Sequence, residues 1–236
     1  MKNSLKFMVY IWFLLLCNKS FATDVMINGK KITVYFNDGD TFKVLDGEYK
    51  NKRARIEGFN SLENYGPVHS FANASKDFLY QMSNLASEHA RNGTWNCSLK
   101  DGKDTYGRLL VVCDDLAHSL IKNGLAHAFS MDSSSAKESY VRLQKEAIEN
   151  KVGMWRFGAP NYIITSLHSK DENGKSTYNR VISTIDGSTK EWKHDNIYST
   201  CENVCLENEN SCMIYVAFNQ RYGDYKTECL LTKSKK

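Results

Sequence analysis

The chain has 236 residues, of which 42% are hydrophobic and 25% are charged, with 14 Gly and only 2 Pro. This composition is ordinary for a folded globular protein and excludes a collagen, a Pro-rich linker array and a disordered tail. The formal net charge is +4, but residues 1–22 contain three lysines and no acidic residue. The rest of the chain is therefore nearly neutral, and bulk charge gives no argument for a nucleic-acid partner.

The first 22 residues have the features of an export signal. Lys2 and Lys6 precede an apolar run over 7–17, which is too short to span a bilayer, and Ser20-Phe21-Ala22 provides small residues for cleavage after Ala22. An uncleaved anchor is the alternative. A lipoprotein site at Cys17 is disfavoured because Leu16 is large. We expect a secreted or periplasmic protein with no stable membrane insertion after the signal is removed.

From residue 24 to about 158, the pattern predicts several strands, a helix, two strands and two helices. Turn residues such as Asn28-Gly29 and Asp46-Gly47 separate the first strands, and apolar residues at steps of three and four mark the first helix. This order predicts an α+β domain built on a five-stranded oligonucleotide-binding barrel with three helices. The expected strands are 25–27, 30–36, 41–45, 53–59, 94–99 and 108–113, and the expected helices are 70–85, 115–123 and 136–150.

The cysteines divide the chain. Six remain after the signal, two of them before residue 158 and four within 201–229. An even number in an exported protein favours three disulfides over a metal site or a catalytic thiol. Residues 166–196 are polar and predict loops and short strands. We place a boundary near 158–160, with a small disulfide-stapled domain over 161–236.

Four local features could carry chemistry: the turn Asp38-Gly39-Asp40-Thr41, Arg55 on the following strand, Glu63 in the next loop, and Arg108 after a polar turn. Singly, each has a structural explanation as a turn cap or a solvated side chain. Together they are the groups that phosphodiester hydrolysis needs. Carboxylates bind a metal and orient or deprotonate water, and arginine forks match phosphate oxygens.

In this order the residues resemble the staphylococcal nuclease (thermonuclease) family over about 24–158. The motifs are Asp38-Gly-Asp-Thr41, Arg55-Ile-Glu-Gly-Phe-Asn-Ser-Leu-Glu63, Tyr65-Gly-Pro67, Asp104-Thr-Tyr-Gly-Arg-Leu109, Leu120-Ile-Lys-Asn-Gly-Leu-Ala126 and Glu146 through Gly153-Met-Trp155. The resemblance implies metal-dependent cleavage of DNA and RNA. It assigns catalysis to Arg55, Glu63 and Arg108, and metal binding to Asp40, Asn60 and the Ser61 carbonyl.

The chain departs from the family pattern at the metal site and at the pocket that holds the base. Asn60 stands where the family has a second metal carboxylate, so calcium binding should weaken, and Mg²⁺ or Mn²⁺ could serve instead. Two tyrosines that line the family's base pocket fall at Ser130 and Asp132. Tyr106 is retained and could reach a phosphate. His69, expected at the start of a helix, is a candidate for contact with the metal or substrate, with a structural role as the alternative.

The resemblance extends to the disulfides. Related exported nucleases carry cysteines on the hairpin that holds Cys97 and Cys113, which implies a Cys97–Cys113 bond. The C-terminal cysteines with Tyr215 and Phe218 between them loosely resemble a PAN/apple module, which implies Cys201–Cys229 and Cys205–Cys212. Four cysteines permit three pairings, so the spacing alone leaves the pairing open. A helix over 197–206 would place Cys201 and Cys205 on one face.

Two functions follow. The first is an exported nuclease acting on DNA, RNA or both with Ca²⁺, Mg²⁺ or Mn²⁺. The second is a catalytically silent barrel that binds nucleic acid or protein, with the C-terminal module as the recognition part. That module would bind a protein or a carbohydrate, or it would serve as a stapled cap that protects the nuclease from proteases. The presence of Arg55, Glu63 and Arg108 favours the first function, and Asn60 favours the second slightly.

Overall fold

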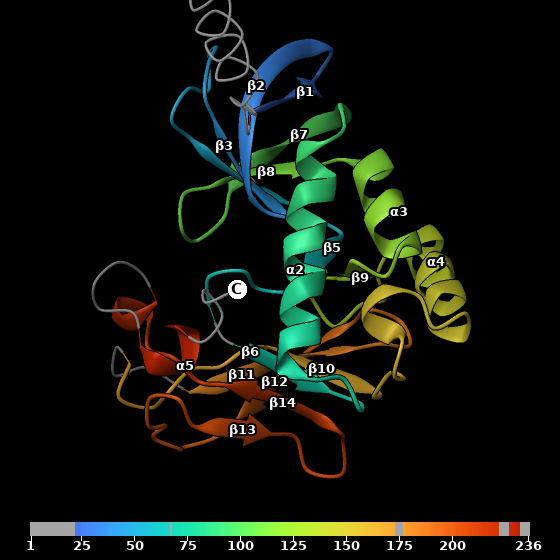
Figure 1. Cartoon of the computed structure of the whole chain (residues 1–236). Coiled ribbons are helices and arrows are strands. Elements are labelled where there is room, and N and C mark those ends of the chain that lie inside the picture. The colour runs from blue at the N-terminus through green and yellow to red at the C-terminus, as the bar shows by residue number, and fades with distance from the viewer. Residues whose placement is uncertain (1–21, 67, 173–176, 222–226, 232–236) are drawn as a thin grey trace, which may run out of the picture.

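The computed structural model describes residues 22–66, 68–172, 177–221 and 227–231, and the predicted signal peptide lies almost entirely outside them. Six of the described strands close a barrel in the order β1-β2-β3-β4-β8-β7, with helices against it (Figure 1). The barrel strands are β1 (Thr23–Ile27), β2 (Lys30–Asp38), β3 (Thr41–Val44), β4 (Arg53–Ile56), β7 (Trp95–Lys103) and β8 (Leu109–Val112).

The α+β barrel is confirmed, but it closes with six strands rather than five. Both strands of the β1–β2 hairpin belong to the barrel. β2 pairs with β3, and β1 pairs in parallel with β7, which closes the barrel. The second parallel pair joins β4 to β8. Side chains alternate between buried and exposed along β2, as the period of a strand requires. The inward-facing residues, among them Val34, Phe36 and Phe42, are fully buried.

The three helices of this part are α2 (Lys76–Arg91), α3 (Asp114–Lys122) and α4 (Glu138–Glu149). The expected helices 115–123 and 136–150 are confirmed to within two residues. The expected helix 70–85 is wrong at its start, because Val68–Phe71 forms the strand β6 and the Ser75 side chain caps α2 by accepting from the Phe78 N–H. Pairing of residues 68–71 with the distant strand 211–214 outweighs the helical spacing of their apolar residues.

The C-terminal part forms two small sheets. One is β10 (Tyr162–Ser166), β11 (Tyr178–Ser183) and β12 (Thr189–Lys193), and the other is β13 (Asn203–Cys205), β14 (Ser211–Ile214) and β6. The second sheet therefore contains a strand from the barrel part of the chain, with Ile214 opposite Val68 and Ser211 opposite Phe71. The short elements β5 (Phe59–Ser61), β9 (Ala126–Ala128), η1 (Gly153–Trp155), η2 (Phe218–Gln220) and α5 (Glu228–Leu231) complete the fold.

The expected helix over 197–206 is wrong. Cys201 has a φ of 67°, which lies in the left-handed region and is incompatible with a right-handed helix, and residues 203–205 form a strand instead. Cys205 lies opposite Cys212 in the β13–β14 hairpin, and a disulfide joins the two. A cross-strand bond replaces the helical spacing that the sequence indicated.

Three disulfides join the six cysteines of the described chain: Cys97–Cys113, Cys201–Cys229 and Cys205–Cys212. These are the pairs that the resemblance implied. Three disulfides are typical of a protein that resides in an oxidising or extracellular compartment. No helix among the described residues is both long and apolar enough to serve as a membrane span.

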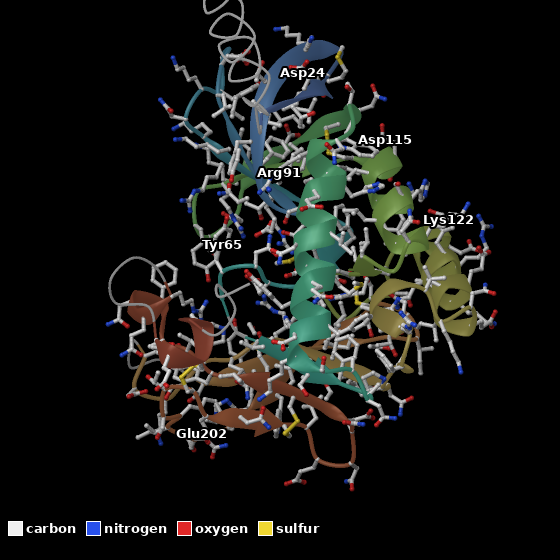
Figure 2. The ribbon with its side chains drawn as sticks, in the orientation of Figure 1. Asp24, Tyr65, Arg91, Asp115, Lys122 and Glu202 are labelled. Atoms are coloured by element: carbon white, nitrogen blue, oxygen red, sulfur yellow. A yellow bond between two sulfur atoms is a disulfide. The ribbon has the colours of Figure 1, made fainter. Side chains whose placement is uncertain are left out.

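The C-terminal part is also tied to the barrel part by hydrogen bonds. The turn between β11 and β12 accepts from the Ser130 N–H at Gly187 O (2.8 Å) and from the Ala136 N–H at Asp186 O (2.8 Å). The Thr189 N–H donates to Asp132 O at 3.1 Å. Ile163 and Ile182 belong to the same buried core as the barrel. Figure 2 shows the side chains of both parts on the ribbon, with Arg91 labelled in the barrel part and Glu202 in the C-terminal part.

Candidate active site

The turn between β2 and β3 places Asp40 against the end of β5. Asp40 is 2% exposed, and its Oδ2 accepts from the Ser61 N–H at 2.8 Å and from Ser61 Oγ at 3.2 Å. Gly39 permits this approach, since a Cβ at position 39 would lie 2.9 Å from the Ser61 Cβ. The Ile56 N–H donates to Asp40 O at 2.8 Å and fixes the turn to β4. The structure thus brings two of the predicted metal ligands together.

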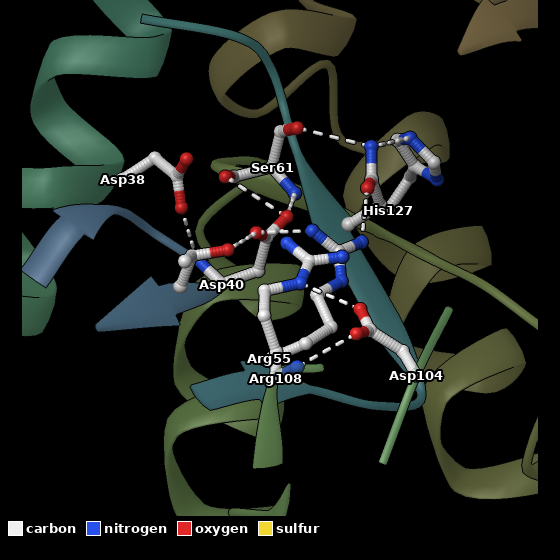
Figure 3. A network of polar contacts seen from close by, with 9 residues as sticks. Asp38, Asp40, Arg55, Ser61, Asp104, Arg108 and His127 are labelled. Carbon is white, nitrogen blue, oxygen red and sulfur yellow. Dashed lines mark hydrogen bonds and ion pairs between the residues drawn. The ribbon is translucent and has the colours of Figure 1, made fainter. Parts of the chain in front are cut away.

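Arg55, on β4, connects Asp40 to Asn60. Its Nη1 donates to Asp40 Oδ1, and its Nη2 donates to Asn60 Oδ1 (Figure 3). The guanidinium also lies 5.9 Å from the centroid of the Phe129 ring. Register explains the placement, because Arg55 lies opposite Thr41, the residue after Asp40. The predicted catalytic arginine is therefore in direct contact with both side-chain metal ligands that were predicted.

Arg108 is held by a second carboxylate. Its Nε donates to Asp104 Oδ2 at 2.6 Å, and its backbone N–H donates to Asp104 Oδ1 at 2.8 Å. Burial opposes ionisation of Asp104, but the hydrogen bonds from Arg108 outweigh it and hold the pKa of Asp104 below its usual range. Figure 3 shows the Arg55 and Arg108 side chains projecting in the same direction, Arg55 from β4 and Arg108 from the turn that precedes β8, the strand paired with β4. Two fixed cations thus serve one site.

Tyr106 lies at the tip of the same turn. Its side chain is 79% exposed, and its backbone N–H donates to Asp104 Oδ1 at 3.0 Å. The Arg108 guanidinium lies 5.5 Å from the centroid of the Tyr106 ring. An exposed hydroxyl beside a fixed arginine is suited to contact with a phosphate or a base.

Asp38 adds a third acidic group to the site. Burial, together with the nearby carboxylates of Asp40 and Glu63, raises the pKa of Asp38 well above its usual range, and Arg55 compensates only in part. Glu63 lies in the loop between β5 and β6, so its carboxylate belongs to the same electrostatic neighbourhood. The site therefore contains Asp38, Asp40 and Glu63, whose charges influence one another, together with Arg55 and the Asp104–Arg108 pair.

His127 contacts the Asn60 side chain from the paired strand β9. The two residues lie opposite each other where β5 pairs with β9, and Asn60 Nδ2 is 3.4 Å from His127 Nε2. Nδ1 of the ring is 3.1 Å from Ala128 O, so Nδ1 carries the proton and Nε2 accepts. Complete burial lowers the pKa of His127 to about 4, and the ring is neutral at pH 7. Asn60 also donates to Ser61 O at 3.0 Å, which leaves its own carbonyl oxygen for Arg55.

Sequence reasoning missed several of these residues. Asp38 was seen only as half of a carboxylate turn, and Asp104 only as part of a motif. His127 was not singled out. Its signal was a polar residue between two alanines in a short apolar strand, which is weak by itself.

His69 does not begin a helix, as the sequence had predicted. It lies in β6, is 4% exposed, and is opposite Met213 of β14. Ser130 and Asp132 stand where the family has the two tyrosines of its base pocket. Both residues are hydrogen-bonded to the β11–β12 turn through their backbones. The C-terminal part is therefore bonded to the backbone of the segment in which the family's tyrosines would lie, although residues 131–135 remain exposed.

The donor set around Asp40 is compatible with a hard divalent cation. Such ions take oxygen ligands, and Asp38, Asp40, the Asn60 side-chain carbonyl and the Ser61 main-chain carbonyl are all oxygen donors. Burial first, and then the charges of Asp40 and Glu63, raise the pKa of Asp38, and a bound cation would oppose these effects. Among the described residues, no three Asp, Glu, His or Cys side chains form a ready metal cluster. The residues fit a site of low charge.

A comparison with known protein families finds a match over part of the chain. Residues 49–157 match the family model described as staphylococcal nuclease homologue. The match contains Arg55, Glu63 and Arg108 and excludes the segment 161–236, for which a PAN/apple resemblance had been noted. No curated protein matches the chain.

Proposed function

We propose that the protein, in which residues 49–157 match the family model described as staphylococcal nuclease homologue, is an exported, metal-dependent endonuclease that hydrolyses phosphodiester bonds of DNA, RNA or both. The observation that carries the proposal is the pairing of two fixed arginines with a carboxylate cluster. Arg55 is bonded to Asp40 and Asn60, Arg108 is bonded to Asp104, and Glu63 lies close enough to raise the pKa of Asp38.

Hydrolysis of a phosphodiester develops negative charge on the equatorial oxygens of the phosphorane. Arg55 and Arg108 would stabilise that charge, because a guanidinium offers two parallel donors to two oxygens. Carboxylates already hold both side chains in position, so the two guanidinium groups need little reorganisation during the reaction. Arg55 would exchange part of its bonding to Asp40 and Asn60 for the phosphate.

Glu63 is the residue proposed to orient or deprotonate the attacking water. A carboxylate within hydrogen-bond reach of that water would orient it or accept its proton. Tyr106, exposed beside Arg108, would contact a phosphate of the substrate. His69 has no role in this proposal because its side chain is buried within the β6–β14 pairing.

Asp40, with Asp38 and the carbonyls of Asn60 and Ser61, would hold the divalent cation. When bound, the cation would neutralise charge on the phosphate and lower the pKa of a bound water. Two carboxylates with neutral donors suit Mg²⁺ or Mn²⁺ as well as Ca²⁺, because Mg²⁺ is often held by one or two carboxylates and substrate phosphates.

The proposal is tested with the mature protein, disulfides intact, and fluorescent single-stranded DNA, duplex DNA and RNA. We expect cleavage in Ca²⁺, Mg²⁺ or Mn²⁺ and none in excess chelator. Absence of cleavage of all three substrates with every metal, with oligonucleotide binding retained, would favour the silent binding barrel instead.

A further inference from the structure

The C-terminal part runs directly beside the loop that carries Glu63. β14 is antiparallel to β6, with Ile214 opposite Val68, so the chain after Ile214 returns along the residues that precede Val68. Val68, Ile214 and Val216 are buried together with Leu230 in one small core. The β13–β14 hairpin is closed by the Cys205–Cys212 disulfide. The pairing and this small core hold residues 214–216 next to the point at which the Glu63 loop enters β6.

Arg221 extends from this segment toward Glu63. Its Nε donates to Val216 O at 2.9 Å, which fixes the plane of the guanidinium. A Cβ at position 66 would lie 3.4 Å from Glu63 Oε2 and 3.8 Å from Arg221 Nη1. Nη1 and Oε2 are therefore no more than 7.2 Å apart, the sum of those two distances. The side chain of Arg221 is only partly buried.

We infer that Arg221 is a substrate-binding residue that the C-terminal part adds to the nuclease site. It would bind a backbone phosphate that flanks the scissile one, because a partly exposed, oriented guanidinium beside the water-activating group is placed for the next phosphate along the strand. The inference rests on the proposed function. It gives residues 161–236 a direct part in substrate binding.

The test compares Arg221→Gln, Arg221→Lys and the control Arg156→Gln with the wild type. Arg156 is a matched control, since its guanidinium also lies 5.9 Å from a phenylalanine ring, as that of Arg221 does, but on the exposed end of η1. Binding of a fluorescein-labelled single strand is measured in chelator over a range of salt. Cleavage is measured on a long single strand and on a dinucleotide, which has a single phosphodiester.

For Arg221→Gln we expect the Kd for the long strand to rise about tenfold, as for loss of one charge-assisted hydrogen bond. The slope of log K against log salt should fall in magnitude by about 0.7, which corresponds to one phosphate contact on a single strand. Cleavage of the dinucleotide should be unchanged. Arg221→Lys should keep the salt slope but not the full affinity, because it keeps the charge and loses the fork.

Two results would overturn the inference. Arg221→Gln and Arg156→Gln could bind the long strand alike, so that Arg221 makes no phosphate contact. Arg221→Gln could also lose cleavage of the dinucleotide and of the long strand equally, which would mean that Arg221 supports the Glu63 loop. If the wild type cleaves nothing, the proposed function fails, but the binding measurements in chelator still decide the role of Arg221.

Discussion

Asp104 sets the position of Arg108, one of the two proposed catalytic arginines. It accepts from the backbone N–H groups of Arg108 and Tyr106 and from the Arg108 side chain. Asp104→Asn removes the charge and turns one acceptor into a donor, so the Arg108 guanidinium loses its fixed orientation. We expect kcat to fall about tenfold or more, the cost of one charge-assisted hydrogen bond.

Asp101→Asn is the control for this change, because Asp101 is an exposed residue of the same hairpin. The two variants are compared by steady-state cleavage, with thermal unfolding to check the fold. Equal activity of Asp104→Asn and Asp101→Asn would show that Arg108 does not depend on Asp104.

Because Asn60 is neutral, we can predict how its replacement changes metal affinity. The affinity of a calcium site increases with ligand charge, so Asn60→Asp should tighten Ca²⁺ binding and shift the activity profile toward Ca²⁺. Asp40→Ala removes the most deeply buried carboxylate of the site and should abolish metal-dependent cleavage. Metal titration of cleavage by wild type and both variants measures these effects. Cleavage by Asp40→Ala at the wild-type rate would mean that Asp40 only caps a turn.

Much of the site could be predicted at the residue scale, because its residues lie in short motifs. Asp40, Arg55 and Asn60 lie in two such motifs, and the structure places them in contact. The contact between Asn60 and His127 could not be predicted, since it joins residues 67 positions apart through the β5–β9 pairing. No local pattern reports such a pairing.

At the scale of elements, Asp114 joins α3 to α4. It is the first residue of α3, and it accepts from Lys137 Nζ at 2.9 Å and from the Tyr140 hydroxyl. These hydrogen bonds, that of Lys137 first, hold the pKa of Asp114 below its usual range. A depressed carboxyl pKa stabilises the fold above the unfolded-state pKa, and this stabilisation is lost as the pH falls through the folded-state pKa.

Asp114→Asn should therefore lower the free energy of unfolding by about 1 kcal/mol at pH 7, the net worth of a hydrogen bond in a half-exposed position. The difference from the wild type should shrink as the pH falls below about 4, where the unfolded carboxyl also binds a proton. Urea unfolding at pH 7, 5 and 3.5 measures this. A difference that stays constant with pH would contradict the assignment.

The Cys97–Cys113 disulfide links β7 to the residue that precedes α3. It closes a separation of 16 residues that contains the Arg108 turn, and both cysteines are buried. Replacing both by Ala should lower the free energy of unfolding by about 3 kcal/mol, as for a loop of this length. Urea unfolding under non-reducing conditions checks the value, and non-reducing peptide mapping that found Cys97 as a free thiol would contradict the bond.

Elements with a strong local period were predicted well, and elements that depend on distant partners were not. α3 and α4 follow from their own apolar spacing. β6 was taken for the start of a helix because its pairing with β14 joins segments some 140 residues apart. The β13 strand was missed for a similar reason, since its conformation is set by a hairpin and a cross-strand disulfide.

At the scale of the whole molecule, the two parts of the chain share a sheet and a core. The C-terminal strand β14 pairs with β6, and the β11–β12 turn bonds to the segment around Ser130. The expected boundary near 158–160 follows the change in composition, but composition does not report such contacts. Arg221, which approaches Glu63, is the point at which this architecture bears on activity.

Glu63, with Arg55 and Arg108, is the proposed catalytic group for phosphodiester hydrolysis. Glu63→Gln tests this proposal most directly, because the substitution keeps the size of the side chain and removes its charge and basicity. We predict a fall in kcat of about 10²-fold or more, the scale seen when a preorganised catalytic group is removed, with an unchanged unfolding temperature. Arg55→Ala and Arg108→Ala should fall by similar factors. Cleavage by Glu63→Gln at the wild-type rate, under conditions in which chelator stops the reaction, would contradict the account.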